Sequence, residues 1–270
     1  MSQQVSYEQF VVAEARRRVE TDYRYNYWSY LGWNILTFGI YSHYATFKLV
    51  ERRTKHVERR LAFLSYFWHA LNTRAESAGQ KEAVAEGLDN LSRIYQQLDT
   101  FERGNKREPV LWMLLRLVFG VVGAYINHFL NKDLLFLDEW ESSYAANAEW
   151  VMQRLGYAVS VPRRAKPVQS RSTGLYVFLS IITVGIWSMV WRYQVMADGN
   201  DHFDDDARIE DALLGAMGLL QTASQWPAEP PGLGAAGGQP PPYVSPDETG
   251  PSDRMPGGGN PPPADPPNQP

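Results

Sequence analysis

The eleven residues Asn34–Tyr44 read N-I-L-T-F-G-I-Y-S-H-Y. They lie within a stretch of 23 residues that carries no formal charge, between Arg24 and Lys48. A helix needs about 20 apolar residues to cross the hydrocarbon core of a bilayer, so this stretch is long enough for one span. The fold depends on whether the helix continues through Gly39. Glycine allows helices to pack closely in lipid, but it is also the usual residue at which a helix stops.

Two further segments have the same character. The 20 residues between Arg171 and Arg192 carry no charge, and the 23 residues between Glu108 and Lys132 carry only Arg116. Aromatic or cationic residues flank each segment, as is typical of membrane interfaces. We therefore predict an all-α, multi-pass integral membrane protein of the cell (plasma or inner) membrane. Its three hydrophobic helices are expected at 25–50, 109–131 and 172–196.

The rest of the chain is predicted to lie outside the membrane. Two apolar series with heptad spacing predict an amphipathic helical hairpin over 51–104, either as a short coiled coil or as two helices packed on the bundle. The Pro/Gly-rich composition of 227–270 cannot bury a core and predicts a disordered tail. The remaining parts are a polar N-terminal arm at 1–24 and amphipathic helices at 132–157 and 203–222. The heptad series are Val57, Leu61, Leu64, Trp68 and Leu71, and then Val84, Leu88, Leu91, Tyr95 and Leu98.

The opening stretch is repeated 146 residues later. I-L-T-F-G-I-Y-S at 35–42 aligns with I-I-T-V-G-I-W-S at 181–188, and the same offset aligns His56 with His202. A weaker middle copy aligns Gly123 with Gly39. Such periodicity indicates that one structural element occurs several times in the fold.

The motif T-x-G-I-[YW] resembles the bacterial membrane proteins grouped as domain of unknown function 4234. It comprises Thr37, Gly39, Ile40 and Tyr41 in one copy and Thr183, Gly185, Ile186 and Trp187 in the other. The resemblance implies an integral membrane protein without an assigned function. It covers about residues 25–60 and 170–206, and more loosely 109–141.

The small residues of the motif have two possible roles. In the first, they form packing points between continuous helices, with hydroxyl groups that bond across the interface. In the second, each helix breaks at Thr-x-Gly into two half-helices, which places every charged helix on one side of the membrane. We predict three continuous spans, with the 48–108 region and the tail in the cytoplasm. The predicted packing residues are Thr37, Gly39, Tyr41, Ser42, Gly120, Gly123, Thr183, Gly185, Trp187 and Ser188.

Three polar residues are candidates for an intramembrane site, because ionisable groups at membrane depth are usually functional. They are Arg116, Asn127 and His128. The pairing of His56 with His202 across the repeat suggests paired ligands, although interfacial polar residues are the simpler interpretation. The acidic run Asp204–Asp206 lacks the glycine and glutamate of a calcium loop and is interpreted as a solvated helix start.

No catalytic, cofactor-binding or metal-binding motif is visible, and we predict that the chain is not an enzyme. The net charge of −4 argues against nucleic-acid binding. The expected partners are the lipid bilayer, a protein bound through 51–104 or the proline-rich tail, and further copies of the chain in a homo-oligomer. Two functions remain open. One is a structural or adaptor membrane protein, and the other is a subunit of a small transporter or channel.

Overall fold

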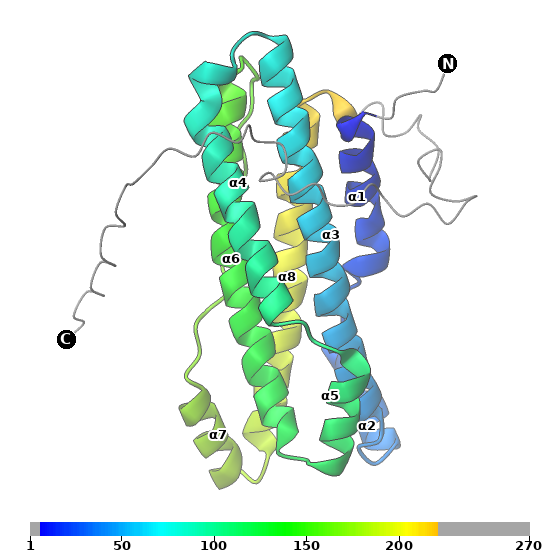
Figure 1. Ribbon diagram of the computed structural model, residues 1–270. Helices are drawn as coiled ribbons and strands as arrows, with labels where there is room; N and C mark the ends of the chain where they lie inside the picture. The colour runs from blue at the N-terminus through cyan, green and yellow to red at the C-terminus, as the bar shows by residue number, and fades with distance from the viewer. Residues whose placement is uncertain (1–5, 221–270) are drawn as a thin grey trace, which may run out of the picture. The chain divides into compact units, whose positions relative to one another are not determined.

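The computed structural model describes residues 6–220, which form eight α-helices and, within that range, no β-strand (Figure 1). The all-α prediction is therefore confirmed, and the tail predicted at 227–270 lies outside the described residues. The helices are α1 (Tyr7–Thr21), α2 (Tyr27–Leu36), α3 (Tyr41–Ser77), α4 (Lys81–Gly104), α5 (Pro109–Val118), α6 (Val122–Arg154), α7 (Thr173–Ile182) and α8 (Ile186–Ala216).

Each predicted membrane segment is divided between a short helix and the start of a long one. The short helices α2, α5 and α7 have 10 residues each. The long helices α3, α6 and α8 have 37, 33 and 31 residues. We call these pairs the first, middle and third hairpins, and Figure 1 shows all three turns at the same end of the helices. The end that carries the three turns is called the hairpin end.

The prediction of three continuous spans is wrong, because the chain turns between the two helices of every pair. Among the helices of residues 6–220, none has both the length and the apolar character that crossing a bilayer requires. The second half of each apolar segment instead runs without interruption into the amphipathic part that follows it. Hence α3 contains the start of the predicted 51–104 hairpin, and α6 and α8 contain most of the other two predicted amphipathic helices.

Within the predicted N-terminal arm, residues Tyr7–Thr21 form the helix α1. Ser6 and Gln9 form a capping box at the start of α1, an arrangement that satisfies two otherwise unbonded amides. Val11, Val12 and Ala15 on one face are buried in the core that α1 shares with α3. The partly buried Phe10 also packs against this core, so a few apolar residues in a largely polar segment are enough to attach α1 to the bundle.

The two heptad series are buried in a core that several helices share. All ten residues are buried except Trp68, which is partly buried and donates from Nε1 to the carbonyl of Leu88 at 2.9 Å. Because α4 packs on α6 as well as on α3, the series belong to the bundle rather than to a two-stranded coiled coil. Gly87 permits this approach, since a Cβ at that position would lie 2.5 Å from Val151.

Two apolar cores are separated by a layer of buried charge. One core lies at the hairpin end and contains Leu49, Ile126 and Trp191. The other fills the remainder of the bundle and contains the buried apolar residues between Val57 and Ala75 of α3 and between Leu137 and Met152 of α6. Between them, α3, α6 and α8 bury charged side chains, which we call the charged layer. Its buried members include Arg52, Arg53, His56, Arg59, Arg60, Asp133, Asp138, Glu141, His202, Asp205, Asp206 and Glu210.

Candidate functional site

The Thr-x-Gly motif forms the same hydrogen-bonded turn in the first and third hairpins. The Thr37 hydroxyl donates to the carbonyl of Trp33 at 2.8 Å and accepts from the amide of Tyr41 at 3.0 Å. Its counterpart Thr183 donates to Leu179 at 2.7 Å and accepts from Trp187 at 3.0 Å. A single hydroxyl thus joins the last turn of the short helix to the first turn of the long one.

Serine completes the turn in both copies. The hydroxyls of Ser42 and Ser188 donate to the carbonyls of Gly39 and Gly185 at 2.7 Å and 2.6 Å. The repeated aromatic residue then packs back across the hairpin. The ring centre of Tyr41 lies 6.4 Å from that of Trp33, and the ring centre of Trp187 lies 6.1 Å from that of Tyr176.

The motif glycines are needed for backbone conformation rather than for helix packing. Gly39 and Gly185 have φ of +91° and +90°, where side chains other than hydrogen are strained. A Cβ at either glycine would meet nothing within 4 Å, so no neighbouring helix approaches them closely. The structure therefore corrects the packing role predicted for these two glycines, since the helix breaks at both.

The middle hairpin makes a different turn. No residue of its connection has positive φ, and Phe119 ends α5 in an extended conformation. Gly120 meets no neighbour, whereas a Cβ at Gly123 would lie 3.2 Å from Nη1 of Arg116. With valine at position 121 in place of the motif threonine, this copy lacks the hydroxyl that closes the other two turns.

The three predicted intramembrane polar residues contact different parts of the fold. Arg116 donates to the Thr46 hydroxyl of α3 at 3.0 Å. His128 hydrogen-bonds through Nδ1 to the Thr173 hydroxyl, at the start of α7. Asn127 is buried and its Oδ1 has no hydrogen bond. No hydrogen bond or ion pair joins any two of the three, so the structure does not assemble them into one polar site.

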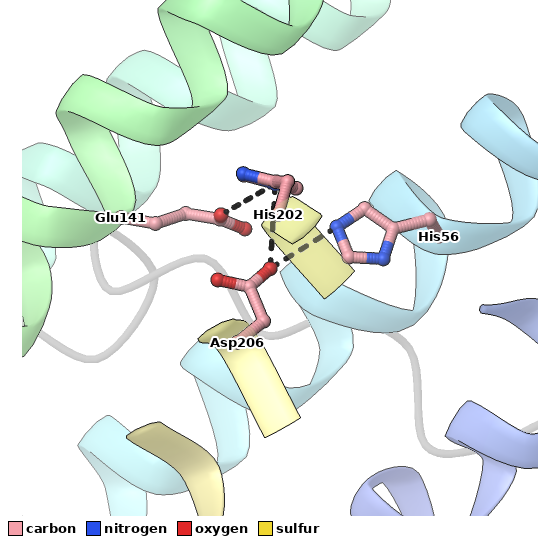
Figure 2. Close-up of side chains that lie close together, drawn as sticks. All are labelled: His56, Glu141, His202 and Asp206. Atoms are coloured by element: carbon pink, nitrogen blue, oxygen red, sulfur yellow. Dashed lines mark ion pairs between the residues drawn. The ribbon is translucent and has the colours of Figure 1, made fainter. Parts of the chain in front are cut away.

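The structure instead brings together groups that are far apart in the sequence. Figure 2 shows His56 from α3, Glu141 from α6, and His202 and Asp206 from α8 pointing toward one another. One ligand atom from each lies within 4.8 Å of the corresponding atoms of the others. Both histidines follow their motif glycine, Gly39 or Gly185, by the same number of residues. The repeat therefore brings them to the same level of the bundle. Their side chains are 1% and 0% exposed, so the interpretation of both as interfacial residues is wrong.

The distances in this group of four are short and regular. Nε2 of His56 lies 3.3 Å from Oδ2 of Asp206. Nε2 of His202 lies 3.3 Å from Oε2 of Glu141 and 3.4 Å from Oδ2 of Asp206. Neither Nε2 atom has a hydrogen bond of acceptable geometry, and neither does Oδ2 of Asp206. The other ring nitrogens do have carboxylate neighbours: Nδ1 of His56 lies 2.9 Å from Asp22, and Nδ1 of His202 lies 3.1 Å from Asp138.

Three arginines surround the group and pair with carboxylates in it or beside it. Arg60 contacts Glu141 and Glu210, each at 2.7 Å. Arg59 bridges Glu210 and Asp22, also at 2.7 Å. Arg164, from the connection before α7, reaches Asp206 at 2.6 Å, Glu141 at 3.0 Å and Asp138 at 3.0 Å. Asp205 and Asp206 lie in the interior of α8, so the acidic run is not a solvated helix start. The charges of Asp205 and Asp206 are buried because arginines and backbone amides neutralise them, whereas Asp204 is partly exposed.

Burial and ion pairing shift the pKa values of the group in opposite directions, and ion pairing has the larger effect. Burial lowers the pKa of His202, but the Asp206 carboxylate raises it, and the result is about 9. Burial raises the pKa of Glu141, but the guanidinium of Arg60 lowers it, to about 2. Burial also raises the pKa of Asp206, but the guanidiniums of Arg164 and Arg60 lower it by more. The pKa of Asp206 therefore lies well below its usual value. Both carboxylates are therefore charged at neutral pH.

Sequence reasoning found only part of this group. The repeat pointed to His56 and His202, but nothing in the linear spacing pointed to Asp22, Asp138, Glu141 or Arg164. A usable signal was the unusual density of arginine, histidine and acid on helical faces that would otherwise continue an apolar stripe, as in 52–60 and 202–210. Such faces indicate buried ion pairs when the opposite charges occur on other helices.

Comparison with known proteins agrees with the motif. No curated protein and no solved structure is significantly similar to the chain. Residues 171–220 match the family model described as Domain of unknown function (DUF4234). This range begins at the third hairpin and includes all of α8, with His202 and Asp206. This match confirms the predicted resemblance to that family for residues 171–220.

Proposed function

We propose that the chain is a membrane protein of the structural or adaptor class, anchored in one leaflet of a cell membrane by its three hairpins. The observation that carries the proposal is the position of the exposed apolar side chains. Among residues 6–220, all but four of the exposed large apolar side chains lie at the hairpin end, in the short helices, the turns or the first eight residues of the long helices. Phe38 and Val184 at two tips are 98% and 93% exposed. Exposed apolar surface of this extent marks an interaction site. The four exceptions are Tyr7, Val19, Trp150 and Leu220.

The turns at the tips are suited to an apolar medium. A backbone amide or carbonyl without a partner costs several kcal/mol in lipid, so irregular backbone must be satisfied internally there. In the first hairpin, the amides of Phe38, Gly39 and Ile40 donate to the carbonyls of the preceding residues Ile35, Asn34 and Thr37. The third hairpin repeats this pattern with Val184, Gly185 and Ile186. The Thr-x-Gly turn therefore exposes apolar side chains while its polar groups bond to one another.

The length of the hairpins fits one leaflet. A 10-residue helix is about 15 Å long, which is about half of a hydrocarbon core of ~30 Å. Charged residues recur at the base of the hairpins: Arg24 and Lys48 bracket the first, and Arg171 and Arg192 bracket the uncharged part of the third. Tyrosine and tryptophan are frequent near the same level, as interfaces favour. We infer that the hairpins enter the bilayer and that the charged parts of α3, α6 and α8 remain on one side of it.

The adaptor role is supported by the placement of the helices. With the hairpins in the membrane, α1, α4 and the distal parts of α3, α6 and α8 form a helical domain beside it. A partner would bind this domain or the proline-rich segment at 227–270. A transporter subunit is less well supported, because Arg116 and His128 hydrogen-bond to different helices and share no polar site.

Thiol labelling tests the hairpin topology directly. The chain has no cysteine, so Val19→Cys and Lys55→Cys each introduce a single thiol, one on either side of the first hairpin. Both native side chains are well exposed. In sealed, uniformly oriented membrane vesicles, an impermeant maleimide should label both variants from the same side. Labelling of the two thiols from opposite sides would establish a continuous span and overturn the hairpin anchor.

Liposome flotation tests the anchor itself. Burial of a Phe or Val side chain stabilises by about 1.5–3 kcal/mol, so loss of both tips should weaken partition at least about a hundredfold. The test variant combines Phe38→Asp and Val184→Asp, and Val19→Asp is the control because Val19 is 82% exposed but lies on α1. Wild type and control should float with phosphatidylcholine vesicles, with or without phosphatidylglycerol. The double variant should remain at the bottom of the density gradient. Equal flotation of all three chains would contradict insertion of the tips.

A further inference from the structure

The group of His56, Glu141, His202 and Asp206 has the features of a metal site, and four independent observations support this. The first is convergence without hydrogen bonds. Both Nε2 atoms and Oδ2 of Asp206 are fully buried, point toward the same space, and lack hydrogen-bond partners (Figure 2). Their nearest neighbours are one another, at ion-pair distances of 3.3 Å and 3.4 Å, and Nε of Arg60 lies 3.5 Å from Oδ2 of Asp206. Buried polar atoms without a well-formed hydrogen bond are uncommon and costly, so three that converge in one place suit a shared ligand.

The second observation is the arrangement behind each imidazole. Nδ1 of His56 faces the Asp22 carboxylate, and Nδ1 of His202 faces the Asp138 carboxylate. Histidines that bind metals almost always donate their other ring N–H to such a group, which fixes the tautomer and leaves a lone pair on the coordinating nitrogen. In the opposite tautomer, Arg164 would donate to Nδ1 of His202 from 3.0 Å. That alternative describes a purely ionic cluster, and the experiment below separates the two.

The third observation is an imbalance of charge. Three guanidiniums, those of Arg59, Arg60 and Arg164, are ion-paired within the cluster. Five carboxylates face them, and Arg18 also approaches Glu210, at 3.9 Å, from the edge of the cluster. When both imidazoles are neutral, negative charge remains in the cluster, and a divalent cation would offset it. The carboxylates are those of Asp22, Asp138, Glu141, Asp206 and Glu210.

The fourth observation is the spacing. Zn²⁺ binds nitrogen and oxygen ligands tetrahedrally at about 2.0–2.1 Å, which places neighbouring ligand atoms about 3.3–3.4 Å apart. Three of the distances within the group are 3.3, 3.3 and 3.4 Å. Two imidazoles with two carboxylates suit Zn²⁺ and related divalent transition metals better than Mg²⁺ or Ca²⁺, which prefer oxygen ligands only.

We propose that His56, Glu141, His202 and Asp206 bind one divalent transition-metal ion, with Zn²⁺ as the best match, in the charged layer of the bundle. All four side chains are buried, at 0–1% exposure, so the ion has a structural role. It joins α3, α6 and α8, the three long helices that continue from the hairpins. The site does not depend on the membrane anchor, and its test uses a different measurement.

The test is Zn²⁺ binding by the full chain in detergent. After chelation and removal of the chelator, Zn²⁺ is titrated in competition with a chromophoric chelator, and bound metal is counted by elemental analysis. Wild type should bind one Zn²⁺ per chain, and Co²⁺ in its place should give the intense visible bands of tetrahedral coordination. His202→Gln should weaken Zn²⁺ binding at least about a hundredfold, which is more than the loss of a group that only hydrogen-bonds to a ligand would cause. His128→Gln changes another histidine outside the site and should bind as wild type does.

Two outcomes would overturn the proposal. The first is wild type that binds no stoichiometric Zn²⁺, which would leave the group as an ionic cluster with protonated histidines. The second is a folded His202→Gln chain with unchanged affinity. If circular dichroism shows that this variant does not fold, Asp22→Asn provides the test, because it keeps all four ligands. Loss of the partner of His56 should then weaken Zn²⁺ binding by about 10–100-fold, and unchanged affinity would refute the site.

Discussion

The Thr-x-Gly turn makes a prediction that can be tested at a single amide. Thr183→Val keeps the shape of the side chain but removes the hydroxyl, which donates to Leu179 at 2.7 Å and accepts from the Trp187 amide at 3.0 Å. The Trp187 amide lies in the first turn of α8, where amides have no partner within the helix. The substitution therefore leaves this amide without an acceptor.

The magnitude follows from the two lost bonds. Each is worth about 0.5–1.5 kcal/mol net, so the turn should lose about 1–3 kcal/mol of local stability. A difference of this size corresponds to about a 5- to 150-fold change in an equilibrium constant. Hydrogen exchange of the Trp187 amide in detergent micelles measures it directly, since exchange requires the turn to open. Thr37→Val should have the same effect on the Tyr41 amide in the first hairpin.

Ser180→Ala is the matched control. Ser180 lies in the same short helix, and its hydroxyl donates only to the carbonyl of Tyr176, at 2.7 Å. The hydroxyl makes no contact with the turn, and the carbonyl of Ser180, which accepts from the Gly185 amide, is kept in alanine. Protection of the Trp187 amide should therefore stay as in wild type. If Thr183→Val and Ser180→Ala change that protection equally, or if neither does, the assignment of the threonine as the closing group of the hairpin is incorrect.

Three other predictions concern the interior of the bundle. Arg60→Met leaves buried carboxylates unpaired and should lower the free energy of unfolding by about 3–5 kcal/mol in urea titrations, whereas Arg93→Met on an exposed face should change it by less than about 0.5 kcal/mol; equal midpoints would contradict the ion network. Burial raises the pKa of Glu102 above 4.5 despite its ion pair with Arg53. Its contribution to the free energy of unfolding is therefore complete at low pH and is lost as pH rises through that raised pKa. Urea unfolding at several pH values should show that the free energy of unfolding declines less with rising pH for Glu102→Gln than for wild type. Asp22→Asn should lower the increase in melting temperature that saturating Zn²⁺ gives, because weaker binding stabilises the folded state less; an unchanged increase would separate Asp22 from the metal.

Local sequence patterns determined the elements of this fold. The period of apolar residues gave the helices, and the repeated Thr-x-Gly gave both the places where the chain could turn and the relation between the first and third hairpins. Whether the helix continued through Gly39 could not be decided from the sequence, because glycine serves both in close packing and at helix ends. The structure decided it, with φ of +91° and open space around the glycine.

The charged layer depended on tertiary structure. Arg60 pairs with Glu141 and Glu210, which are 81 and 150 residues away in the chain. Charge on a helix face usually indicates solvent, and burial becomes favourable only when opposite charges on other helices meet it. The sequence by itself therefore determined helices, turns and an internal repeat that aligned two histidines. Only the packing of three long helices decided that these histidines face two carboxylates, because ion pairing inside a protein depends on distances that the order of residues does not contain.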